Sequence, residues 1–162
     1  MLKKTGLEKL NKTVSRFSGA KVLVIGDLIL DEFIWGDSSR ISPEAPVPVV
    51  LVGRESMMPG GAANVASNIS SIGAKAYLAG VIGRDAHGRE LETILKQRNV
   101  DLEGVISDPG RPTTLKTRVV ARHQQVVRID RESAKPLAEL QNRELLSFIK
   151  SKIKEVDGVI IE

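Results

Sequence analysis

Residues 59–66 read PGGAANVA, and this stretch decides how the rest of the chain is interpreted. Paired glycines before a helix let backbone N–H groups approach a ligand closely, and the first turn of the helix supplies donors without intrahelical partners. Asn64 lies in that first turn, where its amide can both accept a hydrogen bond from a hydroxyl and donate one to it. The local pattern therefore indicates either a hydroxyl-binding helix N-terminus or a tight strand-to-helix connection without a ligand.

The segments on both sides of this stretch predict alternating strands and helices. The expected strands are 21–27, 76–82 and 158–162, and the expected helices begin at Gly60-Gly61, at residue 86 and at Pro136. The strand segments are apolar runs without polar alternation, which suits strands buried on both faces of a parallel sheet. This order predicts a doubly wound α/β domain, in which ligands bind beyond the carboxyl ends of the strands.

Two other segments do not fit a central sheet. Residues 38–50 hold three of the seven prolines. Because proline cannot donate to a strand ladder, this segment is expected to be an edge strand or an extended arm. Residues 114–131 contain two extended runs, LKTRVVAR and VVRIDR, separated by residues 123–125, and they predict a hairpin.

The leading segment, residues 1–19, predicts an amphipathic helix. Thr5 begins a pattern that resembles a capping box, apolar residues then recur at helical spacing, and Gly19 is placed to end the helix. Residues 1–21 carry a net charge of +5 and the rest of the chain carries −1, within a total of +4. The basicity thus belongs to one segment, and we interpret it as a solvated helix face rather than a patch that binds nucleic acid.

The composition bounds the functional class. Hydrophobic residues make up 41% and charged residues 27% of the 162 residues, as in ordinary soluble domains. Aromatic residues are only 3%, which disfavours a stacking surface for single-stranded nucleic acid. The absence of cysteine excludes disulfides, thiolate metal sites and a cysteine nucleophile. Since no apolar run approaches the roughly 18 residues that span a membrane, we expect no membrane partner and a cytoplasmic location.

The familiar nucleotide motifs are missing. Gly83 to Gly88 has the spacing of a P-loop, but the Lys-Ser/Thr pair that should follow is absent. Gly26 is the single glycine of the turn that follows the first strand, a turn we expect to lead into a helix, so the dinucleotide fingerprint is absent as well. This disfavours a Rossmann oxidoreductase. His87 and His123 stand alone in polar contexts and are interpreted as surface residues.

The spacing beyond PGGAANVA carries a family resemblance. Six residues separate Ala66 from Gly73, and nine more separate Gly73 from Gly83. At every specified position this resembles the first signature of the ribokinase (PfkB-type) family of carbohydrate kinases, and the likeness covers residues 20–162. It implies a ribokinase-like, doubly wound, mostly parallel sheet with a small β lid over about residues 34–56. Subunits of that family often pair through the lid, so the resemblance also implies a homodimer.

Within the family, four segments are similar to the kinase half of the bacterial heptose enzymes. They are GDLILD (26–31), RISPEAPVPV (40–49), KTRV (116–119) and QQVVRID (124–130). The resemblance implies phosphorylation of D-glycero-D-manno-heptose 7-phosphate at O1, with ATP and Mg²⁺ as cofactors of the complete enzyme.

The resemblance also assigns eight residues to the sugar phosphate. Two carboxylates are expected on sugar hydroxyls, two glycines and an amide along the sugar, and three cations near the phosphate. These residues are Asp27 and Asp31, then Gly60, Gly61 and Asn64, and finally Lys116, Arg118 and Arg128. Other interpretations stay open, since Asp31 could be a turn cap and each cation a solvated strand residue. The alternation of a hairpin leaves undecided which of its faces meets the sugar.

The chain ends at Glu162, before the family's second signature, a Gly-Ala-Gly-Asp segment that supplies the catalytic aspartate. A buried strand at 158–162 with no following helix also suggests a chain that has been cut. We therefore expect only the N-terminal, sugar-binding portion of a kinase, with no catalytic base, no metal ligands and no tight binding of ATP or Mg²⁺. The alternatives are another sugar or nucleoside kinase of the family, or a non-catalytic module that binds sugar or dimerises.

Overall fold

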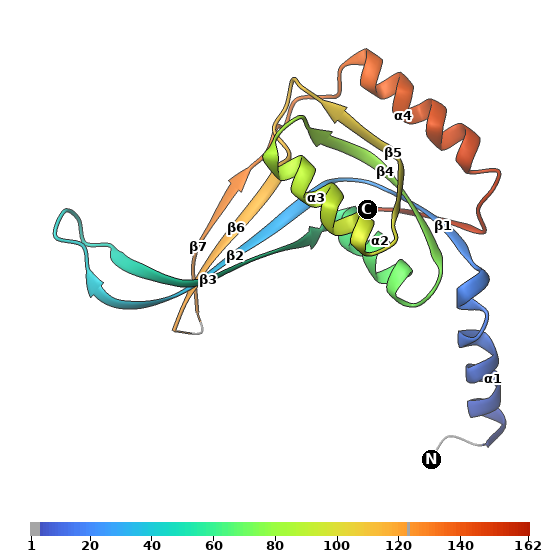
Figure 1. The fold of residues 1–162 in the computed structure, drawn as a ribbon, viewed down its shortest axis with the longest axis horizontal. Coiled ribbons are helices and arrows are strands. Elements are labelled where there is room, and N and C mark those ends of the chain that lie inside the picture. Colours follow the sequence, from blue (N-terminus) through green and yellow to red (C-terminus); the bar gives the residue numbers. More distant parts are fainter. Residues whose placement is uncertain (1–3, 123) are drawn as a thin grey trace.

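The chain folds into two four-stranded sheets with helices around one of them (Figure 1). The structure is a computed structural model that describes residues 4–122 and 124–162. In chain order the elements are α1 Lys4–Val14, a 3-10 turn Phe17–Gly19, β1 Lys21–Ile25, β2 Leu28–Ile41, β3 Pro48–Gly60, α2 Gly61–Ser71, β4 Lys75–Gly83, α3 Ala86–Gln97, β5 Asp101–Asp108, β6 Thr114–Ala121, β7 Gln124–Arg131, α4 Glu139–Lys152 and β8 Gly158–Ile161.

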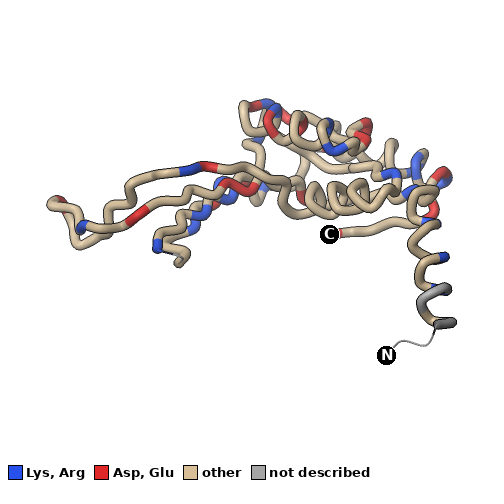
Figure 2. The backbone as a smooth tube through the Cα atoms, turned by 60° about the horizontal axis from the view of Figure 1, so that its bottom comes forward, with Lys and Arg blue, Asp and Glu red and all other residues tan. Residues whose placement is uncertain are grey.

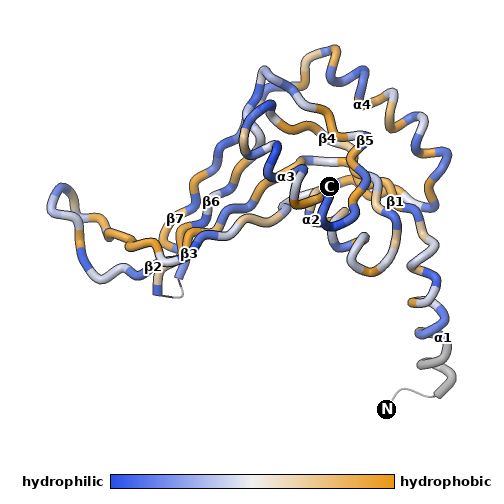
Figure 3. The backbone as a smooth tube through the Cα atoms, in the orientation of Figure 1, coloured by the Kyte–Doolittle hydropathy of each residue, from blue (hydrophilic) through white to orange (hydrophobic). Residues whose placement is uncertain are grey.

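Sheet A has the strand order β5-β4-β1-β8, and all of its strands are parallel. Val24 of β1 and Leu78 of β4 face α2 and α3, whereas Leu23 and Tyr77 face α4. Because successive residues of a strand point to opposite faces, the apolar runs of β1 and β4 serve two cores at once. Figure 3 shows both strands as hydrophobic throughout much of their length. The expected α/β layering with helices on both faces is confirmed.

Sheet B has the order β3-β2-β6-β7 and mixes directions: β2 pairs antiparallel with β3 and parallel with β6, while β6 and β7 form an antiparallel hairpin. The expected hairpin over 114–131 is therefore confirmed. Strands β2 and β3 extend beyond β6 as a long two-stranded arm, which Figure 1 shows projecting from the body. Pro48 is the first residue of β3, where a missing N–H donor is tolerated.

Several element boundaries differ from the sequence-based expectation. The chain passes from β1 into strand β2 instead of a helix, because it crosses at Gly26-Asp27 from sheet A to sheet B. Helix α4 begins at Glu139, three residues after Pro136. Gln124 and Gln125 belong to β7 and not to the hairpin loop, whose residue 123 lies outside the described residues.

The two ends of the described chain differ in their packing. Helix α1 begins at Lys4, so Thr5 lies inside the helix, and the side chain of Thr5 lies outside the described residues. Leu10 and Val14 of α1 are exposed, and Figure 1 shows this helix standing away from the sheets. Strand β8 lies at the edge of sheet A, and its Ile161 is exposed. No helix among the described residues is long and apolar enough to cross a membrane.

Candidate functional site

A cleft of about 290 Å³ opens where the carboxyl ends of β1 and β4 meet sheet B. Its floor comes from the end of β1 and from residues 79–81 of β4, and its walls come from the start of β2, from β6, from the connections on either side of the β6–β7 hairpin and from α4. The lining residues that matter below are Asp27, Gly80, Arg111, Thr114, Lys116 and Glu132. A Cβ at Gly80 would lie 2.6 Å from the carbonyl oxygen of Gly26, so the floor can form only with glycine there.

The glycine pair lies beside this cleft and fits closely against both predicted acids. A Cβ on Gly60 would lie 2.7 Å from Oδ2 of Asp31, and a Cβ on Gly61 would lie 2.5 Å from the carbonyl oxygen of Asp27. Gly61 has φ +54°, a conformation that glycine adopts without strain. The N–H of Ala62 donates to the carbonyl of Asp27 at 3.0 Å. The start of α2 is thereby fixed against the β1–β2 turn.

Asp31 is half-buried on β2 and forms an ion pair with Nη1 of Arg118 on β6. The guanidinium of Arg118 also lies over the ring of Phe33, 5.3 Å from its centroid. A cation so placed is attracted by the face of the ring. The guanidinium of Arg118 is thus positioned by both Asp31 and Phe33, and its charge is paired with a carboxylate of the protein itself.

The strand register decides which face of the hairpin lies beside Asp31. Lys116 is paired in register with Asp31 on one side and with Asp130 on the other, while Arg118 is paired with Arg128. Residues opposite one another in neighbouring strands share a face, so Asp31 and all three predicted cations lie on the same face of sheet B. Figure 2 shows Lys and Arg recurring along this hairpin.

A third acid, Asp85, which the sequence analysis did not single out, holds the segment beside the lining residues Pro112 and Thr114 in place. Asp85 caps α3 by accepting from the N–H of Gly88 at 2.8 Å, and it accepts from the N–H and hydroxyl of Thr113 at 2.9 and 2.7 Å. Burial raises the pKa of Asp85, but the hydrogen bonds from Thr113 and Gly88 outweigh burial, so its pKa lies below the usual value. This network fixes the start of β6 to α3.

Comparison with known proteins places this chain in a family. The profile of the pfkB family carbohydrate kinases matches residues 20–160. The chain belongs to that family. The matched span includes both sheets apart from Ile161 at the end of β8, and every residue of the site described above, and it leaves α1 outside.

Two curated relatives of this pfkB-family chain are bifunctional HldE proteins. The protein from Helicobacter pylori strain G27 is 52% identical over 141 residues, which are 87% of this chain and 30% of that protein. The protein from Wolinella succinogenes is 45% identical over 140 residues, again 30% of its length. This chain therefore spans less than a third of the curated relatives that it matches.

Solved structures agree on the fold. A carbohydrate kinase from Agrobacterium tumefaciens superimposes with a TM-score of 0.67 at 19% identity, covering 88% of this chain and 45% of that one. Arabidopsis thaliana ribokinase, determined with ribose and ATP, gives 0.57 at 21% identity over 68% of this chain and 35% of its own. The expected ribokinase-like fold is confirmed.

The eight predicted site residues occupy different places in this pfkB-family fold. Asp27 and Lys116 line the cleft, and the other six do not. Beside the cleft, Gly60 packs against the carboxylate of Asp31, and Gly61 packs against the carbonyl of Asp27. Of the remaining three, Asn64 is exposed on the first turn of α2, Arg118 forms an ion pair with Asp31, and Arg128 is exposed on β7 with its Nε 2.9 Å from Oδ1 of Asp130.

Sequence reasoning missed Arg111, which the structure places in the cleft wall. Its Nε donates to Oδ2 of Asp108 at 3.2 Å, and its Nη2 donates to the carbonyl oxygens of Lys135 and Pro136 at 2.8 and 3.2 Å. Two of these partners lie more than twenty residues away in the chain. No short sequence pattern could have indicated contacts of that separation.

Proposed function

We propose that this chain is the sugar-binding part of a carbohydrate kinase. The complete enzyme would transfer the γ-phosphate of ATP to O1 of D-glycero-β-D-manno-heptose 7-phosphate, in the biosynthesis of ADP-heptose for lipopolysaccharide. We assign this part to residues 20–162, with a lid over about 34–56. The class of enzyme is supported by membership of the pfkB family, and the substrate by the likeness to the HldE proteins.

One observation carries the proposal: the carboxylate of Asp31 lies against Gly60, and Asp31 is on the strand that begins directly after the cleft residue Asp27. A carboxylate can accept hydrogen bonds from two sugar hydroxyls at once, and Gly60, which has no side chain, lets the start of α2 lie close against the carboxylate of Asp31. Asn64 is assigned to a further hydroxyl. These residues would bind and orient the sugar, so that much of the barrier is lowered by positioning.

Phosphoryl transfer additionally needs ATP and Mg²⁺, which supply the phosphoryl group and neutralise its developing charge. Among the described residues, no three His, Asp or Glu side chains cluster as a metal site would require. We assign no residue of this chain to either cofactor and propose that ATP and Mg²⁺ act in the complete enzyme. The chain alone is expected to consume no ATP, and a coupled assay with heptose 7-phosphate checks this.

The substrate assignment is tested by calorimetry with a panel of sugars. Heptose 7-phosphate, fructose 6-phosphate, ribose and adenosine are titrated into the purified chain. Preferred binding of heptose 7-phosphate supports the proposal. Preferred binding of another member favours the alternative within the family, a kinase for a different sugar or nucleoside, and overturns the heptose assignment.

A second candidate function is association without catalysis, through the arm formed by β2 and β3. Ile41 and Leu51 on this arm are 64% and 74% exposed, and Figure 3 shows the arm with hydrophobic segments. Exposed apolar strands of this kind favour pairing with a second copy of the chain. We propose a cytoplasmic homodimer through this lid. Light scattering of the wild type and of Leu51→Lys checks it, since the variant should remain monomeric.

A further inference from the structure

The described lining of the cleft contains two cationic side chains, Arg111 and Lys116. Arg118 and Arg128 share the face of sheet B with Lys116, but they do not line the cleft. Each of them is instead paired with a carboxylate, Arg118 with Asp31 and Arg128 with Asp130. Of the three cations predicted on the hairpin face, Lys116 alone lines the cleft, and the second cation of the cleft, Arg111, comes from outside the hairpin.

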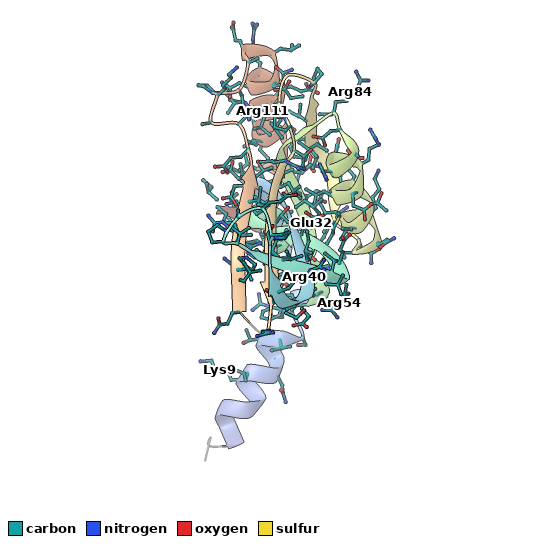
Figure 4. All side chains as sticks on the ribbon, turned by 90° about the vertical axis from the view of Figure 1, so that its left-hand side faces the viewer. Lys9, Glu32, Arg40, Arg54, Arg84 and Arg111 are labelled. Carbon is teal, nitrogen blue, oxygen red and sulfur yellow. The ribbon has the colours of Figure 1, made fainter. Side chains whose placement is uncertain are left out.

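Arg111 is held rigidly with part of its guanidinium unused. Its Nε and Nη2 are engaged by Asp108 and by two backbone carbonyls, and Asp108 is itself 7% exposed and accepts from the N–H of Gly110 at 2.8 Å. Among the described residues, Nη1 has no acceptor. A guanidinium is planar, so fixing two of its nitrogens also fixes the direction of the third. Figure 4 places Arg111 beside α4, at the opposite end of the molecule from Lys9.

Lys116 brings a second charge to the same wall. Its strand neighbours in register are Asp31 and Asp130, but those carboxylates are engaged by Arg118 and Arg128. Lys116 forms no ion pair with a described residue, so its ammonium group remains available. An ammonium group is a compact charge with three donors on a flexible stem, and such a group can follow an anion that Arg111 orients.

We infer that Arg111 and Lys116 form a subsite for a phosphate monoester in the cleft. Charge-assisted hydrogen bonds from a fixed guanidinium and a mobile ammonium are suited to a phosphate dianion. The same cleft holds Asp27 and Glu132, whose carboxylates suit sugar hydroxyls and repel a phosphate. The ligand is therefore a sugar phosphate, bound with its phosphate toward Arg111. The assignment of the sugar rests on the proposed function, whereas the placement of the phosphate does not.

The subsite makes Arg118 and Arg128 structural partners of Asp31 and Asp130 and not phosphate ligands. This separates two explanations of a basic hairpin that the sequence could not separate. Variants of all four cations can therefore be compared within one chain, and Arg122, which is exposed and away from the cleft, provides a matched control.

The experiment is calorimetry on the full chain with heptose 7-phosphate, heptose, inorganic phosphate and ATP as separate probes. Arg111→Gln and Lys116→Gln should each raise the Kd for heptose 7-phosphate about 10-fold or more, and change the Kd for heptose by less than about 3-fold. Arg122→Gln should change neither. Because Arg111→Gln also removes a structural contact, Lys116→Gln, which lies outside the Asp108 network, keeps the test decisive if the first variant fails to fold.

Equal losses of affinity for heptose and for heptose 7-phosphate in Lys116→Gln would overturn the subsite. A selective loss of affinity for heptose 7-phosphate that occurs only in Arg118→Gln or Arg128→Gln would also overturn it. So would variants of Arg111 and Lys116 that lose affinity for ATP alone. If the wild type binds no heptose but binds inorganic phosphate, and both cleft variants weaken that binding, the subsite stands and the proposed sugar is wrong.

Discussion

Replacing Gly60 by alanine should disturb the sugar site without straining the backbone. Gly60 has φ −119° and ψ 171°, which alanine adopts readily. Its new methyl group would lie 2.7 Å from Oδ2 and 2.9 Å from Cγ of Asp31, and 3.1 Å from Cγ2 of Ile29. Carbon and oxygen atoms do not approach so closely, so the carboxylate must move by several tenths of an ångström. That movement strains its ion pair with Arg118.

The magnitude follows from overpacking a buried position, which costs about 1–3 kcal/mol. Urea unfolding of Gly60→Ala should show this loss, and calorimetry should show weaker sugar binding. Gly53→Ala is the matched control on the same strand, because the nearest atom to its Cβ is the carbonyl oxygen of Trp35 at 3.8 Å. That variant should lose no stability.

A double-mutant cycle identifies the cause. If the methyl group acts through the carboxylate, the cost of Gly60→Ala should fall by about 1 kcal/mol or more when Asp31 is also replaced by alanine. A variant Gly60→Ala that unfolds at the wild-type urea concentration and binds sugar unchanged would refute the reasoning. So would a cost that is the same with and without the Asp31 carboxylate, because the clash would then lie elsewhere.

Three further predictions concern single side chains. Arg118→Ala should weaken the binding of heptose and of heptose 7-phosphate equally in calorimetry, because it removes the ion-pair partner of Asp31, while Arg128→Ala should leave both dissociation constants unchanged. A selective effect of either variant on the binding of the phosphorylated sugar contradicts this. Asn64→Ala should weaken sugar binding by about 1–3 kcal/mol in a folded variant, and an unchanged dissociation constant would remove the residue from the site. Folding lowers the pKa of Asp85, so the stability that its carboxylate contributes is present above its unfolded pKa and is lost as the pH falls through the lower folded pKa. Urea midpoints measured from pH 7 to pH 2 should therefore fall less steeply in Asp85→Asn than in the wild type.

Local sequence signals were sufficient to predict β1, β4 and β8 of the central sheet, whereas β5 was not among the expected strands. The runs that became β1 and β4 are apolar at consecutive positions, and that pattern is typical of strands covered on both faces. The glycine pair at residues 60 and 61 also marked the start of α2 correctly. These elements are determined by neighbouring residues, so a single sequence reveals them.

Features that depend on contacts between residues far apart in the chain could not be predicted from the local sequence. Strand β2 follows β1 directly because the chain changes sheets, and nothing in residues 26–31 states which sheet a strand will join. The face of the hairpin that lies beside Asp31 depends on the pairing of β2 with β6, which are separated by more than seventy residues. Arg111 was missed because its partners are defined only when the chain has folded.

The arm has two mechanical regimes along one continuous strand. Strand β2 has 14 residues, about 46 Å at 3.3 Å per residue, and it begins directly after the cleft residue Asp27. Its inner part is flanked by β3 and β6, but pairing with β6 ends at Gly36, where the register with β3 also shifts. The inner part of β2, up to Gly36, is therefore stiff, and the outer part, which pairs with β3 alone, is more flexible. We therefore expect a force at the tip of the arm to bend it near Gly36 and to displace Asp31, which has a paired strand on both sides, much less, so that docking on the outer part should leave the geometry of the cleft unchanged.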